Sequence, residues 1–328
     1  MKPLAAAALG ALSLISASCS RDYRWHTMQG VIWNTSYSIK YQSVNSLDDS
    51  IVATFSRVEM SLSPFLPGSR ISQINRNETD QTDTLIDFIF QTSQTVNNLS
   101  GGAFDPTLSP LINLWGFGYD KTDSQALPTD SAIYSALAHV GIADCNISEG
   151  LISKKTPETT FNFSAITKGY ACDLISDMLS RNGVTNSMVE IGGEITIRGH
   201  NDRGRLWRIM LEAPAEHFDS KRTGMATIEL TGCAVASSGN YRNYHETGNR
   251  RYGHTISATT GRPIQTGILS ASIIAPNCAI ADALATATMA MPVTDAIEML
   301  EQLEGVKAVI TTSDSIYSVG EICNILSL

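Results

Sequence analysis

The sequence predicts an α+β fold in which mixed or antiparallel sheets pack against helices. Segments with apolar residues at helical spacing alternate along the 328-residue chain with β-rich segments that can form hairpins. Hairpins interspersed with separate helices are typical of the α+β class. No Gly/Ser-rich linker divides the chain, so we expect a single unit after the N-terminal segment.

One strand, two helices and a loop are expected in the first part of the chain. Residues 31–42 alternate in polarity and are rich in β-formers, which predicts a strand. Ser46 and Asp49 have the spacing of a capping box, and the helix after them has one apolar face. That face is formed by Ile51, Phe55, Val58 and Leu62. A second helix is expected over 83–100, before two glycines, and a polar surface loop over 121–131.

The second part of the chain alternates helices with strands. A helix is expected over 165–181, and a helical run over 279–291 is stopped by Pro292. The β-rich stretches suggest two pairings, of 187–198 with 205–212 and of 226–238 with 268–275. The last expected elements are a helix marked by Ala296, Leu300 and Leu303 and strands near 307–312 and 316–319.

The charge of the chain excludes one class of partner. The sequence has 23 Lys+Arg against 32 Asp+Glu, a formal net charge of −9. Proteins that bind nucleic acid neutralise phosphates with a basic surface, whereas no basic block here is longer than Lys154-Lys155. We therefore expect no nucleic-acid partner. A local metal ion can still favour an anionic ligand on an acidic protein.

The first residues predict an export signal. Residues 4–18 are almost wholly small or apolar, but about 15 residues are too few to span a bilayer. Small residues directly before Cys19 indicate a lipoprotein cleavage site. Residues 1–18 would then be a lipoprotein signal peptide, and 19–328 would be an extracytoplasmic (periplasmic-side) protein anchored to the membrane by lipid on Cys19. Ordinary secretory cleavage near Ser18 is the alternative.

Cysteine usage disfavours two kinds of structural site. Five cysteines remain beyond Cys19, an odd number without a CxxC pair. This pattern is unlike a full disulfide framework or a zinc site. We expect small buried thiols, with one or two bridges left open.

Two segments have features of a ligand site. Residues 101–118 combine a glycine turn, Asp105 and several aromatics, so the backbone can approach a ligand closely or the aromatics can simply pack the turn. Residues 162–173 lead into a helix whose first turn holds Lys168. A helix start with a lysine suits a phosphate. The segment is not a Walker A loop, however, and such a start is often structural.

Three further places stand out. Gly192 and Gly193 interrupt a strand pattern, either at a bulge or where the backbone meets a planar ligand. His254 follows a glycine in a turn-rich stretch that substrate could reach, although a lone His is more often structural. Asp282 and Thr286 share one face of an otherwise apolar helix. They suit Mg²⁺ as hard oxygen ligands, or they bond to each other.

In this order, the motifs resemble those of the ApbE-type FAD:protein FMN transferases. The matching motifs are GAFDPT with PLxNLWGFG, the KGYAxD helix, Glu-x-Gly-Gly-Glu, SGNY and ADALAT. The resemblance extends from about residue 25 to residue 320. It implies a single ApbE-like (T-fold-related) catalytic unit that binds FAD together with Mg²⁺.

The resemblance also implies roles for individual residues. Those that would contact FAD are Met28, Phe65, Ala103, Phe104, Asp105, Asn162, Lys168 and Thr255. Those that would hold the metal are Asp282, Thr286 and the backbone carbonyls of Ala165 and Ala279. Asp282 would thereby be catalytic, as would His254, which would act as the base. Asn162 stands where the family usually has Asp.

The reaction implied by the resemblance is a phosphoryl transfer. In similar proteins the FMN half of FAD moves to a Thr hydroxyl of an acceptor protein and AMP is released, so FAD is a substrate and not a redox cofactor. The expected partners are acceptor subunits of membrane redox complexes that carry the target Thr. Two alternatives remain open: an FAD pyrophosphatase that gives FMN and AMP, and a non-catalytic flavin-binding lipoprotein.

Overall fold

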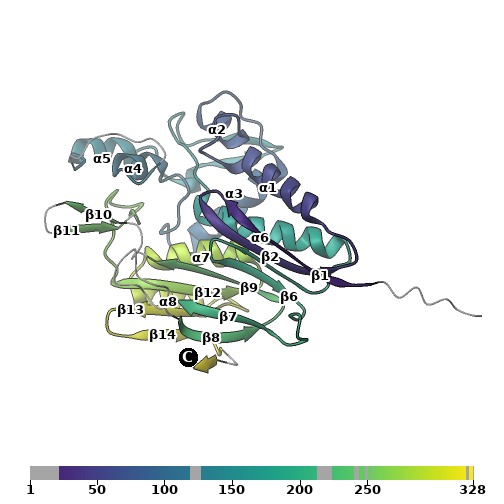
Figure 1. Ribbon diagram of the computed structural model, residues 1–328. Coiled ribbons are helices and arrows are strands. Elements are labelled where there is room, and N and C mark those ends of the chain that lie inside the picture. The colour runs from purple at the N-terminus through teal and green to yellow at the C-terminus, as the bar shows by residue number, and fades with distance from the viewer. Residues whose placement is uncertain are drawn as a thin grey trace, which may run out of the picture.

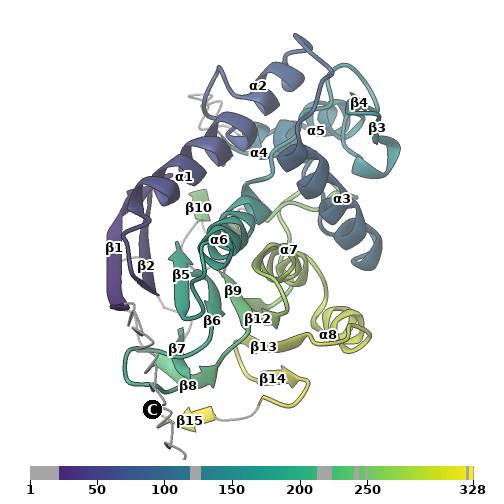
Figure 2. The same ribbon diagram turned by 90° about the vertical axis from the view of Figure 1, so that its right-hand side faces the viewer.

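The computed structural model describes residues 22–118, 127–212, 224–239, 244–247, 250–253, 255–322 and 325–327. These residues form an α+β fold, as predicted. Helices pack on one face of an eight-stranded sheet, and a three-stranded sheet packs on its other face (Figures 1 and 2). Within the ranges given above, no helix is both long enough and apolar enough to cross a membrane.

All pairings among the described strands are antiparallel. In spatial order, the strands of the large sheet are β1 (Arg24–Ile32), β2 (Thr35–Ser43), β5 (Ser187–Ile191), β6 (Glu194–Arg198), β9 (Cys233–Gly239), β12 (Ile268–Ala275), β13 (Lys307–Thr312) and β14 (Ile316–Val319). The three-stranded sheet has the order β15 (Ile325–Ser327), β8 (Gly224–Leu230) and β7 (Trp207–Glu212). Two small hairpins are formed by β3 (Asn146–Ser148) with β4 (Leu151–Ser153) and by β10 (Tyr244–Thr247) with β11 (Arg250–Gly253).

The helices belong to two groups. Against the sheet lie α1 (Asp48–Leu62), α6 (Ser164–Arg181), α7 (Cys278–Met289) and α8 (Val293–Glu301), and α3 (Thr84–Leu99) packs on α1, α6 and α7 (Figure 2). Shorter helices occupy the connections, namely α2 (Arg70–Asn75), α4 (Ser109–Leu114), α5 (Asp130–Leu137) and the 3₁₀ helix η1 (Ile142–Asp144).

The side chains of the central strands alternate between two hydrophobic cores, one on each face of the sheet. On β9, Ala234 and Ala236 pack in the core beneath the helices, whereas Val235 packs in the core against the three-stranded sheet. On β12, Ile273 and Ile274 divide in the same way. Successive side chains of a strand point to opposite faces. Strands covered on both faces are therefore largely apolar, as β12 is apart from Ser270 and Ser272.

The strand expected over 31–42 is in fact part of a hairpin. β1 ends at Ile32 and β2 begins at Thr35. Trp33 and Asn34 have φ values of 47° and 60°, which is the positive-φ pair that a two-residue type I′ turn requires. Neither turn residue is a glycine, so the usual mark of such a turn is absent from the sequence.

The pattern over 187–198 is also a hairpin, and its predicted pairing is wrong. Gly192 and Gly193, with φ of 68° and 109°, form the turn between β5 and β6 rather than a bulge. β6 pairs with β9, whereas β7, within the predicted 205–212, pairs with β8 in the small sheet. The predicted stretch 226–238 divides into β8 and β9, and β9 pairs with β12 as expected.

The predicted helices are confirmed, with one change at a helix start. α1 buries the predicted apolar face. Leu47 is its N-cap, and Ser46 Oγ accepts a hydrogen bond from the amide of Asp48 at 3.2 Å, so the expected capping box is not formed. Of the loop expected over 121–131, residues 121–126 lie outside the described ranges and Asp130 already begins α5.

The cysteines that the structure describes are free thiols. Cys145, Cys172 and Cys278 are buried. Burial raises the pKa of each of these thiols, which keeps them protonated and unreactive at neutral pH. This is the state expected for small buried residues. Cys19 and Cys323 lie outside the described residues.

Helices α6 and α7 lie side by side on the sheet and come unusually close together (Figure 2). Gly169 of α6 stands at the contact. A Cβ there would lie 2.3 Å from the carbonyl oxygen of Cys278 and 2.8 Å from the Cβ of Asp282. No side chain fits at such distances, so glycine is required for the two backbones to approach.

Gly169→Ala is expected to lower the free energy of unfolding by about 1–3 kcal/mol, because the added methyl group would push α6 and α7 apart. The sign is the reverse of the usual effect, since Gly→Ala inside a helix normally stabilises. Urea denaturation measures the change. Gly68→Ala is the matched control, because a Cβ at that position has no atom within 4 Å. An unfolding free energy unchanged by Gly169→Ala would contradict the close contact.

Candidate functional site

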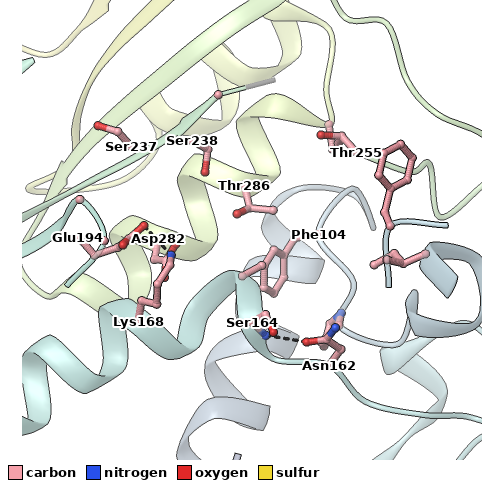
Figure 3. Close-up of a pocket in the computed structure, with 18 of the residues that line it drawn as sticks. Phe104, Asn162, Ser164, Lys168, Glu194, Ser237, Ser238, Thr255, Asp282 and Thr286 are labelled. Atoms are coloured by element: carbon pink, nitrogen blue, oxygen red, sulfur yellow. Dashed lines mark hydrogen bonds and ion pairs between the residues drawn. The ribbon is translucent and has the colours of Figure 1, made fainter. Parts of the chain in front are cut away.

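A cavity of about 990 Å³ brings together most of the residues predicted for the site. Its walls are the turn at 103–106, the start of α6, one face of α7, and parts of β6, β9 and β12 (Figure 3). This volume is at the upper end of the range for small-molecule sites. The predicted residues that line it are Phe65, Ala103, Phe104, Asp105, Asn162, Ala165, Lys168, Thr255, Asp282 and Thr286.

A charged cluster occupies one side of this cavity (Figure 3). Lys168 Nζ lies 2.8 Å from Glu194 Oε1, and Glu194 is only 3% exposed. Asp282, equally buried, accepts a hydrogen bond at Oδ2 from the Gly169 amide at 3.0 Å. Burial lowers the pKa of the Lys168 ammonium, but the charges of Asp282 and Glu194 outweigh burial and raise that pKa above its ordinary value.

The cluster contains two carboxyl groups but only one ammonium group among the residues described. Burial raises the pKa of Asp282 to about 7, although the Lys168 charge opposes the shift. Glu194 Oε2 is buried and has no hydrogen-bond partner among the residues described. Two buried carboxylates beside a single ammonium are incompletely compensated. A further positive charge would stabilise both carboxylates.

Asp282 and Thr286 fit the chemistry of a hard divalent cation. The alternative, a mutual hydrogen bond, is not formed in the part of the chain that the structure covers: Asp282 accepts from Gly169 instead. Thr286 lies one turn further along α7 and lines the cavity, so its hydroxyl is available (Figure 3). A carboxylate and a hydroxyl are oxygen ligands that suit Mg²⁺.

Backbone carbonyls, phosphate or water would have to complete such a site. No group of three His, Cys, Asp or Glu side chains is arranged as metal ligands within the described ranges. Ala165 lines the cavity, and the usual helical donor to its carbonyl, the Gly169 N–H, donates to Asp282. The Ala165 carbonyl oxygen therefore accepts, at most, a hydrogen bond that the Gly169 N–H shares with Asp282. Ala279 is buried in the first turn of α7 and is not among the cavity-lining residues.

The turn that carries Asp105 is held in place by its own carboxylate. Asp105 Oδ1 accepts from the amide and the hydroxyl of Thr107 at 2.8 and 2.6 Å, and Oδ2 accepts from the Ile142 amide at 3.1 Å. Burial raises the pKa of the Asp105 carboxyl, although these hydrogen bonds act to lower it. Asp105 thus shapes the wall, and the Phe104 ring lies on the cavity (Figure 3).

The start of α6 offers fewer free amides than expected. Asn162 Oδ1 accepts from the Ser164 amide at 3.0 Å (Figure 3). The amides of Ile166 and Thr167 donate to the Phe163 carbonyl at 3.0 and 2.9 Å. These N–H groups are therefore not available to a phosphate. Lys168, in the same turn region, remains the positive group that can reach an anion.

The other predicted residues have different positions. Phe65 is 68% exposed at the cavity rim, and Thr255 lines the cavity. Met28 lies on β1, partly buried against the main core, and does not line the cavity. His254 and Cys19 lie outside the residues that the structure describes.

Two carboxylates of this region, the buried Glu194 and the partly buried Asp173, were not predicted as site residues. Glu194 is in the Glu-x-Gly-Gly-Glu motif, and an acidic residue directly after a hairpin turn and before an apolar strand is the signal that marks it. Asp173 of α6 accepts from the amides of Cys278 and Ala279 at 2.9 Å each. Both roles depend on partners remote in sequence, so neither follows from local spacing.

Asp282 should make the stability of the cation-free protein depend on pH. The carboxyl has a pKa of about 7 in the fold against 3.8 ordinarily, so between about pH 4 and 7 the folded state keeps a proton that the unfolded state has lost. The contribution of Asp282 to the free energy of unfolding therefore falls as the pH rises through that window, by up to about 1.4 kcal/mol per pH unit. Asp282→Asn should make the fall shallower, as measured by urea denaturation in EDTA at several pH values.

A control separates this effect from a general loss of negative charge. Asp177, on the exposed side of α6 with a side chain 52% exposed, can be changed to Asn without touching the cluster. Asp177→Asn should keep the wild-type pH dependence. An equally steep fall in Asp282→Asn would contradict the buried, protonated state of Asp282. Asp173, whose pKa burial raises to about 6, adds a smaller fall of the same sign in every variant.

Comparisons with known proteins agree on one family. The ApbE family model matches residues 33–310. An FAD:protein FMN transferase of Vibrio cholerae is 35% identical over 289 residues, 85% of each chain, and one of Haemophilus influenzae is 32% identical over 307 residues, 89% of this chain and 88% of the relative. The solved flavin transferase ApbE from Vibrio cholerae has a TM-score of 0.81 at 31% identity and covers 91% of this chain and 98% of its own. The chain therefore belongs to the ApbE family and is an enzyme of the flavin-transferase kind.

Proposed function

We propose that the protein transfers FMN from FAD to a Thr hydroxyl of an acceptor protein, with Mg²⁺, and releases AMP. The observation that supports this most is the cluster of Lys168, Glu194 and Asp282 beside the Thr286 hydroxyl on the cavity wall. An anionic pyrophosphate can pair with the ammonium, and a divalent cation can pair with the carboxylates. The FAD:protein FMN transferases among the relatives support the choice of FAD.

The proposed reaction exchanges one phosphorus–oxygen bond for another. The acceptor Thr oxygen bonds to the phosphorus of the FMN half, and the bond from that phosphorus to the bridging oxygen breaks. AMP leaves with the bridging oxygen, and the flavin is joined to the acceptor by a phosphoester. A bound Mg²⁺ supplies neutralisation of the charge that develops on the leaving phosphate. Asp282, Thr286 and the Ala165 carbonyl would hold this ion.

Other residues of the chain would bind FAD and move the proton. Lys168, with a side chain 30% exposed, can reach a phosphate oxygen while Glu194 fixes its position. Phe65 at the rim would pack against the planar flavin ring. His254 is the proposed base that takes the proton from the acceptor Thr, because a neutral Thr hydroxyl is a poor nucleophile.

Flavin transfer can be tested directly. Incubation with FAD, Mg²⁺ and an acceptor domain that carries the target Thr should place flavin fluorescence on the acceptor in a denaturing gel, with one AMP released per label. Asp282→Ala should lower this rate by about 100-fold or more, because the ion that stabilises the leaving phosphate loses a ligand. Asp177→Ala, at an exposed position of α6 nine residues after Lys168, should label the acceptor at the wild-type rate.

The alternatives predict different products. FMN and AMP without acceptor labelling would assign the site to FAD hydrolysis. Retained FAD without AMP would leave only flavin binding. An acceptor with Thr→Val should stay unlabelled, and label on that variant would contradict transfer to the Thr hydroxyl.

We also propose that the mature protein is anchored on the extracytoplasmic side through lipid on Cys19. The apolar run at 4–18 and the small residues before Cys19 support this. An anchor would keep the enzyme near acceptor subunits of membrane redox complexes.

Cys19→Ser should abolish incorporation of a radiolabelled fatty acid and move the protein from the membrane to the soluble fraction. Flavin transfer in solution should persist, because Cys19 precedes the first strand of the catalytic unit. Unchanged fatty-acid labelling would contradict the proposed attachment site. Ordinary secretory cleavage would instead leave both the wild type and the variant unlabelled.

A further inference from the structure

Asp173 connects the three elements that carry the charged cluster. It lies on α6, and its carboxylate accepts from two amides of α7: that of Cys278, at 2.9 Å from each oxygen, and that of Ala279, at 2.9 Å. Thr196 of β6 donates its hydroxyl to Asp173 Oδ1 at 3.0 Å. One side chain thus ties α6 to both α7 and β6.

Asp173 and the residues that donate to it each lie close in sequence to one member of the charged cluster. Lys168 is on α6, little more than one turn before Asp173. Asp282 is one turn after Cys278 on α7. Glu194 lies two residues before Thr196 on β6, so both side chains are on the same face of the strand.

A second hydrogen bond joins the same helices in the opposite direction. Gly169 of α6 donates its amide to Asp282 of α7 at 3.0 Å. Each helix therefore supplies a carboxylate to the backbone of the other. Because backbone amides cannot change rotamer, this reciprocal arrangement fixes how far along α6 the Asp282 carboxylate lies.

The negative charge of Asp173 suits this place better than a neutral amide would. Three donors converge on its two oxygens, and an Asn would direct its own NH₂ group at one of them. A carboxylate at the N-terminal end of α7 is also favoured by the helix dipole. Asp173 is not among the cavity-lining residues, so any influence on a ligand must pass through the groups it holds.

We propose that Asp173 is a positioning residue for the cation site: by holding the first turn of α7 and Thr196 of β6, it sets where Asp282 stands relative to the Lys168–Glu194 pair. This inference rests on the proposed function, since it assumes that Asp282 binds a divalent cation. Residues that orient metal ligands without touching the metal typically change metal affinity by about 10- to 100-fold. A merely structural residue would change the unfolding free energy and leave cation affinity unaltered.

Mn²⁺ is a suitable probe, because the electron paramagnetic resonance signal of free Mn²⁺ reports its binding to the full-length protein without any turnover. Asp173→Asn should raise the Kd for Mn²⁺ by about 10- to 100-fold. Thr196→Val removes one tether and keeps the Asp173 charge, so it should raise the Kd by a smaller factor. Asp177→Asn, one turn further along α6 and paired with Arg198, is the matched control and should bind as the wild type does.

Flavin transfer provides an independent readout. In Asp173→Asn, the Mg²⁺ concentration needed for half-maximal rate should rise by the same factor as the Mn²⁺ Kd, and saturating Mg²⁺ should restore most of kcat. A loss of kcat that excess Mg²⁺ does not restore would overturn the inference.

The outcomes separate this inference from the proposed function. A lower unfolding free energy with an unchanged Mn²⁺ Kd in Asp173→Asn overturns the positioning role alone. If Asp173→Asn does not fold, Thr196→Val decides, and an unchanged Kd in that variant overturns the role. A wild-type protein that binds no Mn²⁺ overturns the cation site itself, and the inference with it.

Discussion

The close approach of α6 to α7 at Gly169 is the constraint on which the rest of the site depends. Without a side chain at this position, the Gly169 amide can reach the Asp282 carboxylate at 3.0 Å. Lys168 is the preceding residue, so the same contact brings its side chain to the buried carboxylates. α7 permits this approach because its buried face is largely alanine. Two segments more than a hundred residues apart in the chain thereby become one site.

Charge in this cluster is balanced only in part by the protein itself. Lys168 pairs with Glu194, and Asp282 has a Gly169 amide but no ion pair of its own among the described residues. An incompletely paired buried carboxylate lowers stability, and its raised pKa expresses that cost. Any ligand that supplies positive charge to the folded state alone would restore the loss. The stability of the empty fold and its affinity for a cation are therefore linked at one side chain.

The sequence predicts elements that depend on local patterns and fails where pairing is long-range. The apolar face of α1 follows from periodicity, because burial of one face imposes it, and β13 and β14 have the predicted bounds. The Trp33-Asn34 turn is missed because it lacks the glycine that usually marks a type I′ turn. The partner of β6 is missed because strand order is set by packing of the whole sheet.

In the candidate site, too, residues marked by local patterns are predictable, and residues that depend on long-range contacts are not. Asp282 and Thr286 are predictable because two polar residues one turn apart on an apolar helix need an explanation. Lys168 is predictable from the motif order, whereas its partner Glu194 requires knowledge of how β6 lies against α6. Met28 is carried over by resemblance alone, and the structure places it on β1, partly buried against the main core and outside the cavity lining.

Most polar groups on the cavity wall are already engaged by the fold, and this restricts how a ligand can lie there. Asp105 holds its own turn, and Asn162 holds the start of α6. The charged groups Lys168, Glu194 and Asp282 gather on one side, away from Asn162, and Thr286 lies closer to Phe104 (Figure 3). On the proposed function, the pyrophosphate of FAD would therefore occupy the charged side. The flavin ring would then extend toward the aromatic side and the exposed Phe65, where an acceptor protein can approach from solvent.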